Sequence, residues 1–148
     1  MGYFGGTTKH PMDTTGRVSF PAKFRRALPE TEDLVIVQSP IEDFPSLWIF
    51  TSDEFKEWVD DLIEGKGGYQ ANSDAVNYYV SALYGSMEYI PIDTVGRIRV
   101  PVELRKNASL GKEVMIIGAG RRIEIWNEGI RTQYLESQKK KNKIIDKP

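Results

Sequence analysis

The chain has 148 residues, of which 40% are hydrophobic and 28% are charged, and it contains no cysteine. This composition is typical of one globular domain or two small ones, and it excludes a disulfide framework and thiolate chemistry. The net charge of −1 argues against a simple polyanion binder. No apolar run approaches the roughly 18–20 residues of a membrane span, and the first residues lack a secretory-signal pattern, so the sequence predicts a soluble cytoplasmic protein.

The charges are segregated along the chain. Between Lys9 and Arg26 there are five basic residues and the single acid Asp13, whereas residues 30–64 hold eleven acids and one base. The last 18 residues contain six bases and two acids. A basic face and an acidic face can therefore coexist on this protein despite its small net charge.

An internal repeat organises the chain. The segment Asp13-Thr-Thr-Gly-Arg-Val-Ser-Phe-Pro-Ala-Lys-Phe-Arg-Arg is matched 80 positions later by Asp93-Thr-Val-Gly-Arg-Ile-Arg-Val-Pro-Val-Glu-Leu-Arg-Lys. The same offset relates Asp33-Leu-Val-Ile-Val to Glu113-Val-Met-Ile-Ile, and a later apolar segment in each half follows at an offset of 76. Matching of both the motif and the segments after it indicates a duplication.

Each copy predicts the same order of short elements. Asp-x-x-Gly-Arg predicts a tight turn, because aspartate accepts a nearby backbone N–H and glycine adopts a positive φ easily. An alternating segment then predicts a short strand, and a proline after it suits the first turn of a short helix. Two apolar strands close each copy as a hairpin. The predicted strand, helix and hairpin strands lie at 18–20, 22–28, 34–37 and 47–50 in the first copy, and at 98–100, 102–108, 114–117 and 123–126 in the second.

Two helices are predicted between the copies and one after them. Residues 52–64 and 73–84 carry apolar side chains three and four positions apart, and residues 127–141 predict a last helix before a basic tail. The apolar stripes fit either the core of the chain or an interface with another subunit. The predicted division is a first copy at 5–51, a helical pair at 52–86, a second copy at 87–127, and a C-terminal helix with its tail at 128–148.

The repeated Asp-x-x-Gly-Arg-Val/Ile-x-x-Pro-x-x-Phe/Leu-Arg-Arg/Lys motif resembles the AbrB-type swapped-hairpin DNA-binding domain. Two copies separated by a helical pair resemble the MraZ family, and the resemblance runs from about Phe4 to about Trp126. It is weaker in the loop 38–46 and the linker 65–72, and it does not assign the basic tail.

The resemblance implies an α+β fold in which two AbrB-like swapped-hairpin halves form a pseudo-symmetric small β-barrel. It also implies a cytoplasmic, nucleoid-associated transcription regulator that binds short direct repeats upstream of the division and cell-wall gene cluster. The expected partners are double-stranded DNA and further copies of the chain in a ring-shaped homo-oligomer. No cofactor, metal, membrane or small-molecule substrate is expected.

Arg17 and Arg97 are the strongest candidates for DNA contact, because each follows a glycine in a tight loop and a planar guanidinium suits guanine or phosphate. The alternative is an internal pair in each loop, Asp13 with Arg17 and Asp93 with Arg97. The residues expected to shape the loops are Asp13, Gly16, Asp93 and Gly96.

Further basic residues flank these loops. Arg25, Arg26, Arg105 and Lys106 end the short helices, where they could contact phosphates or simply be solvated. Lys9 and His10 precede the first loop and have no basic counterparts in the second copy. If Lys9 and His10 contact DNA, the two copies are not equivalent.

Other classes of protein fit less well. The chain is not expected to be an enzyme, because it has one histidine, no phosphate loop, no metal-ligand spacing and no nucleophile elbow. The arginine beside each duplicated aspartate would lower the pKa of that carboxyl and make it a poor acid. A ring-forming assembly protein that does not bind DNA is the alternative, and the negative net charge favours it. An AbrB-like antitoxin would need only one copy.

Overall fold

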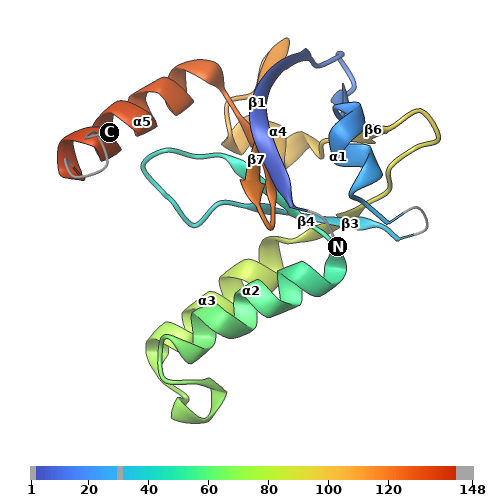
Figure 1. Cartoon of the computed structure of the whole chain (residues 1–148). Coiled ribbons are helices and arrows are strands. Elements are labelled where there is room, and N and C mark those ends of the chain that lie inside the picture. Colours follow the sequence, from blue (N-terminus) through green and yellow to red (C-terminus); the bar gives the residue numbers. More distant parts are fainter. Residues whose placement is uncertain (1–2, 30–31, 143–148) are drawn as a thin grey trace.

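The computed structural model describes residues 3–29 and 32–142 (Figure 1). The end of the predicted basic tail, residues 143–148, lies outside this range. In chain order the elements are β1 (Phe4–Pro11), β2 (Arg17–Ser19), α1 (Ala22–Arg26), β3 (Leu34–Gln38), β4 (Leu47–Phe50), α2 (Ser52–Glu64), the short 3-10 helix η1 (Tyr69–Ala71), α3 (Asp74–Ser86), β5 (Glu88–Ile90), β6 (Arg97–Arg99), α4 (Val102–Asn107), β7 (Glu113–Gly120), β8 (Ile123–Trp126) and α5 (Glu128–Lys141).

Strands from the two copies are interleaved. Six strands form an antiparallel sheet in the order β1-β7-β8-β4-β3-β5, and β2 and β6 form a separate two-stranded ribbon. In the sheet, β1 of the first copy pairs with β7 of the second, and β5 of the second copy pairs with β3 of the first. Exchanging the copies maps the strand order onto itself, so the domain has a pseudo-twofold axis. The α+β class and the two-repeat organisation are confirmed.

The predicted small β-barrel is not found as a closed barrel. In the described part of the chain β1 pairs only with β7 and β5 only with β3, so the six-stranded sheet keeps two edges. The strands β2 and β6 pair with each other instead of joining the sheet. Closure requires strands long enough to bond neighbours on both sides, whereas β2, β5 and β6 have three residues each, about 10 Å of chain.

The first core lies between the sheet and the ribbon and belongs to both copies. Alternate residues of β3 and β4, such as Ile36 and Ile49, pack there with Val18 and Ile98 from the ribbon. The helices α1 and α4 add Phe24 and Leu104 to the same cluster. Because each half supplies part of this core, neither half could bury its apolar side chains alone.

The remaining residues of β3 and β4 face the helical pair. Helices α2 and α3 lie side by side against this surface (Figure 1). Phe55 and Val59 of α2 and Val76 and Leu83 of α3 are buried there. The apolar stripes of the two helices are therefore part of the core of the chain itself.

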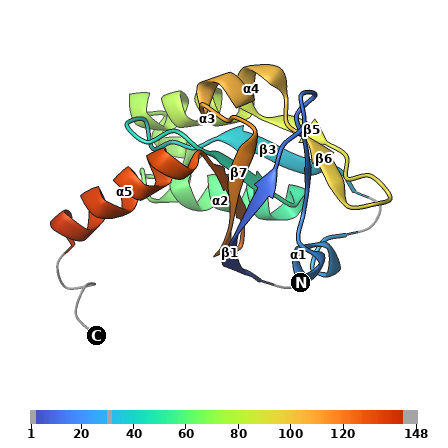
Figure 2. The ribbon, with the colours of Figure 1, turned by 90° about the horizontal axis from the view of Figure 1, so that it is seen from above.

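Helix α5 projects from the body on the side away from α1 (Figures 1 and 2). Its Tyr134 ring stacks on Trp126 of β8 at 5.0 Å between ring centroids. Tyr134 of α5 thus covers Trp126 of the second copy, whereas the outer face of β3 and β4 in the first copy is covered by α2 and α3. Of the described helices, none combines the length and the hydropathy needed to cross a membrane.

Candidate nucleic-acid interface

The two repeated loops meet at the β2–β6 ribbon. Three cross-strand pairs join its strands: Arg17 with Arg99, Val18 with Ile98, and Ser19 with Arg97. Val18 and Ile98 are 1% and 2% exposed and close the core beneath the ribbon. Because successive side chains of a strand alternate between its faces, the flanking residues point outward. The ribbon therefore presents Arg17, Arg97 and Arg99 together on one exposed face.

Arg99 was not among the residues predicted for this site. The repeat aligns Arg99 with Ser19, so this position is not basic in both copies and the shared motif does not indicate it. The signal that could have found it is the alternation Arg97-Ile98-Arg99, which places both arginines on the same face of a strand.

Arg17 and Arg99 stand directly opposite each other. Like charges at such a cross-strand position destabilise a ribbon. In residues 3–29 and 32–142, neither side chain has a carboxylate within salt-bridge distance. An anion placed between two guanidinium groups would relieve their repulsion, and phosphate oxygens match the geometry of this donor.

Each loop is held by its aspartate. Asp13 Oδ1 accepts hydrogen bonds from the backbone N–H of Thr15 and of Arg17, both at 2.9 Å. Asp93 Oδ1 accepts the equivalent bonds from Val95 at 3.0 Å and Arg97 at 2.9 Å. The backbone of each arginine is thereby fixed at the point where its strand begins.

These contacts favour the ionised carboxylates. The backbone N–H of Arg17, followed by the Thr15 hydroxyl, lowers the pKa of Asp13 from 3.8 to about 2. The backbone N–H of Arg97 is the largest cause of a lowered pKa at Asp93. The folded loops therefore stabilise the charged carboxylates of both aspartates.

Acid should destabilise the protein partly through Asp13. Because its pKa is lower in the folded than in the unfolded chain, its contribution is fully present above pH 3.8 and is lost as the pH falls towards about 2. We expect Asp13→Asn to flatten the decline of Tm in this interval, measured by circular dichroism. An unchanged decline in the variant would contradict this assignment.

The two loop arginines differ in their side-chain contacts. Arg97 Nε lies 2.9 Å from Asp93 Oδ2, so this internal pair is formed. The corresponding pair of Arg17 with Asp13 is not formed, although both are described residues. Among the described residues, the internal pair is therefore formed in the second loop only.

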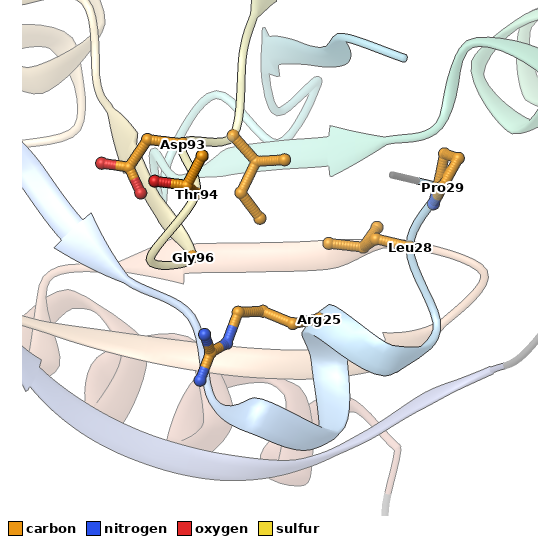
Figure 3. A pocket seen from close by; sticks show the side chains of 7 residues that line it. Arg25, Leu28, Pro29, Asp93, Thr94 and Gly96 are labelled. Atoms are coloured by element: carbon orange, nitrogen blue, oxygen red, sulfur yellow. The ribbon is translucent and has the colours of Figure 1, made fainter. Parts of the chain in front are cut away.

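Two further arginines cross from one copy to the loop of the other. Arg25 of α1 donates through Nη1 to the carbonyl of Val95 at 3.2 Å, and Arg105 of α4 donates through Nη1 to the carbonyl of Thr14 at 3.4 Å. Figure 3 shows Arg25 reaching towards the loop that carries Asp93, Thr94 and Gly96. Both arginines thus brace a loop of the opposite copy, a contact that the sequence did not suggest.

The other predicted contact residues are spread more widely. Arg26 is exposed on α1, and Lys106 on α4 lies 3.9 Å from Glu103. Lys9 Nζ pairs with Glu128 of α5 at 3.0 Å, and the hydrogen bond to Glu128 raises the pKa of Lys9. His10 is half-buried on β1, opposite Val114. The structure therefore gathers Arg17, Arg97, Arg25 and Arg105 around the ribbon but directs Lys9 to α5.

The ribbon and the acidic helix α2 lie on opposite faces of the sheet. Helix α2 carries six acids and the single base Lys56, and it packs on the face that the ribbon does not cover. The six acids of α2 are thus separated in space from the arginines of the ribbon.

Comparison with known proteins matches both copies. The family model described as "MraZ protein, putative antitoxin-like" covers residues 3–66 and 84–147, with one Asp-x-x-Gly-Arg loop in each stretch. A protein named Transcriptional regulator MraZ from Treponema denticola is 34% identical over 88% of this chain and 86% of its own length. Proteins of that name from Alkaliphilus oremlandii and Mycoplasmoides gallisepticum are 38% and 30% identical, over 84% and 90% of this chain and 80% and 88% of their own lengths. The chain belongs to the MraZ family.

Proposed function

We propose that this protein is a sequence-specific DNA-binding transcription regulator and that the β2–β6 ribbon is its contact surface. The observation that carries the proposal is the outward face of Arg17, Arg97 and Arg99 on a short antiparallel ribbon. The names of its relatives, which describe regulators of transcription, support the same function.

The shape of the ribbon suits duplex DNA. The major groove of B-DNA is about 12 Å wide and admits a two-stranded β-ribbon. In that position an arginine can donate two hydrogen bonds to guanine O6 and N7, while others reach phosphates. Arg25 and Arg105 hold the loops that begin the two strands, and Arg26 and Lys106 extend the basic surface along α1 and α4.

The resemblance to the family supports finer statements. It suggests that the target consists of short direct repeats upstream of the division and cell-wall gene cluster, and that the protein acts in the cytoplasm at the nucleoid. The pairing of β1 with β7 and of β5 with β3 supports the description of two swapped hairpins. The two copies would then act as one DNA-binding unit.

Repeated DNA sites call for several copies of the ribbon. A few arginines at one site give weak attachment, with non-specific dissociation constants of roughly 10⁻⁴–10⁻⁶ M at physiological salt. Joining such sites in one assembly raises the affinity by about 10²–10⁴ when the spacings match. We therefore propose a homo-oligomer, with the ring suggested by the family as its form.

The direct test is fluorescence anisotropy with a labelled duplex from upstream of the gene for this chain, across a salt series. We expect Arg17→Ala and Arg99→Ala each to weaken binding by about tenfold. The slope of the logarithm of the binding constant against the logarithm of the salt concentration should fall in magnitude by about 1 for each lost phosphate contact. Lys56→Ala is the matched control, because it removes one exposed positive charge from the opposite side of the sheet.

Two outcomes would contradict the proposal. One is binding that is absent or independent of salt. The other is an equal loss in Lys56→Ala and Arg17→Ala, with the oligomer intact by sedimentation. The first result would favour the ring-forming assembly protein that does not bind DNA, whereas the second would show that the ribbon is not the contact surface.

A further inference from the structure

The two loops differ at one position that faces the aspartate. The residue after Asp-Thr is Thr15 in the first loop and Val95 in the second. The Thr15 hydroxyl donates to Asp13 Oδ1 at 2.7 Å, in addition to the two backbone N–H groups that this oxygen accepts. Valine has no hydroxyl, so the Asp93 carboxylate lacks this third donor.

This difference coincides with the state of the neighbouring arginine. Asp93, with two backbone donors on Oδ1, also accepts Arg97 Nε on Oδ2 at 2.9 Å. Asp13, with three donors, leaves the Arg17 guanidinium without a carboxylate partner in the described part of the chain. Each hydrogen bond to a carboxylate stabilises its charge, so a third donor reduces what a guanidinium would add.

We propose that the residue at position 15 in the first loop, and at position 95 in the second, determines whether the arginine of that loop is free to bind DNA. As a result, Arg17 contributes more to DNA affinity than Arg97. This inference rests on the proposed function and assigns unequal parts to the two copies. Arg17 presents to the DNA a guanidinium that forms no salt bridge among the described residues, whereas Arg97 must first break its pair with Asp93 or bind while still paired. Thr15 and Val95 are the residues that set this inequality.

The size of the effect follows from the exposure of the Arg97–Asp93 pair. Its side chains are 43% and 40% exposed, and an exposed ion pair shifts an equilibrium by up to about fivefold. Removal of the hydroxyl from the first loop and addition of one to the second should therefore change DNA affinity by a few-fold each, in opposite directions. Removal of the arginines themselves should have the larger effect.

The first experiment exchanges the two residues and measures anisotropy with the same labelled duplex. We expect Arg17→Ala to weaken binding more than Arg97→Ala does. We expect Thr15→Val to weaken binding and Val95→Thr to strengthen it, each by up to about fivefold. Thr15→Ser keeps the hydroxyl and should bind as the wild type does, and Val95→Ala adds no hydroxyl and should also leave affinity unchanged.

A double variant separates this effect from a direct contact of the hydroxyl with DNA. If Val95→Thr acts by releasing Arg97, its gain disappears in the Arg97→Ala background. If the new hydroxyl binds DNA directly, the gain persists there and the inference is wrong.

A measurement without DNA tests the pair itself. The Arg97 Nε–H should give a protected signal in ¹⁵N–¹H NMR spectra that weakens in Val95→Thr and Asp93→Asn, whereas the Arg17 signal should become protected in Thr15→Val. A wild type that binds no duplex removes the proposed function and this inference with it. A wild type that binds, with equal losses in the two arginine variants and no effect of the exchanges, overturns the inference alone.

Discussion

Glu124→Ala is expected to lower the free energy of unfolding by about 3 kcal/mol, because it removes a buried carboxylate to which two arginines and an indole are bound. The Glu124 side chain is 6% exposed, and its Oε2 accepts from Nε and Nη2 of Arg122, both at 2.8 Å. Its Oε1 accepts from the indole N–H of Trp126 at 2.8 Å and lies 3.5 Å from Nη1 of Arg131. Alanine would leave these donors in partly buried positions without an acceptor.

Removal of the Glu124 carboxylate should also affect the contact between the sheet and helix α5. Glu124 pairs across β4 and β8 with Trp48, whose ring lies 3.4 Å from the Arg122 guanidinium carbon. Arg131 belongs to α5, so the same carboxylate connects the centre of the sheet to the C-terminal helix. The variant should therefore loosen α5 as well as destabilise the sheet.

Two variants make the measurement specific. Glu124→Gln keeps an acceptor for Trp126 but removes the charge, so its cost in urea unfolding should be smaller than that of alanine. Glu57→Ala removes a carboxylate that pairs with Arg121 but is 62% exposed, and should cost less than about 1 kcal/mol. Equal losses for Glu57→Ala and Glu124→Ala would show that burial of this carboxylate does not matter.

Local sequence signals predicted the parts of the fold that depend on near neighbours. The loops follow from aspartate and glycine at fixed spacing, and helix α2 occupies the predicted residues 52–64 because its apolar stripe is regular. The strands β1 and β5 were not predicted. β1 contains two glycines and ends in a proline, which give little local preference for a strand, and it forms by pairing with β7 more than 100 residues later.

Contacts between the copies were harder to predict at the site. The repeat pointed to Arg17 and Arg97 but not to the register that places Arg99 opposite Arg17. Arg25 was predicted at a helix end, and its contact with the loop 70 residues later depends on how the two halves interlock. Arg122, in the loop between β7 and β8, is only 28% exposed because it pairs with Glu124 on the buried strand β8. Such contacts are set by tertiary packing, which a single copy does not encode locally.

The crossing arginines also explain why an added methyl group at the loop glycines should be costly. Gly16 and Gly96 have φ of +88° and +83°, so alanine would be strained at either position by about 1–2 kcal/mol. At Gly96 a Cβ would lie 2.0 Å from Arg25 Cδ, a flexible side chain that can move at the loss of its hydrogen bond to Val95. At Gly16 it would lie 2.8 Å from the carbonyl oxygen of Val100, which cannot move without disturbing the ribbon.

Gly16→Ala is therefore expected to lower the free energy of unfolding by about 3 kcal/mol and Gly96→Ala by about 2 kcal/mol, measured by urea unfolding. Gly111→Ala, where a Cβ would meet nothing within 4 Å, should change it by less than about 0.5 kcal/mol. Removal of the Arg25 side chain should abolish the steric part of the Gly96→Ala cost, so the double variant Arg25→Ala with Gly96→Ala should be more stable than the sum of the single losses predicts. Strict additivity would mean that Arg25 does not pack against Gly96 in solution. A positive coupling would show that the helix of the first copy holds the arginine loop of the second.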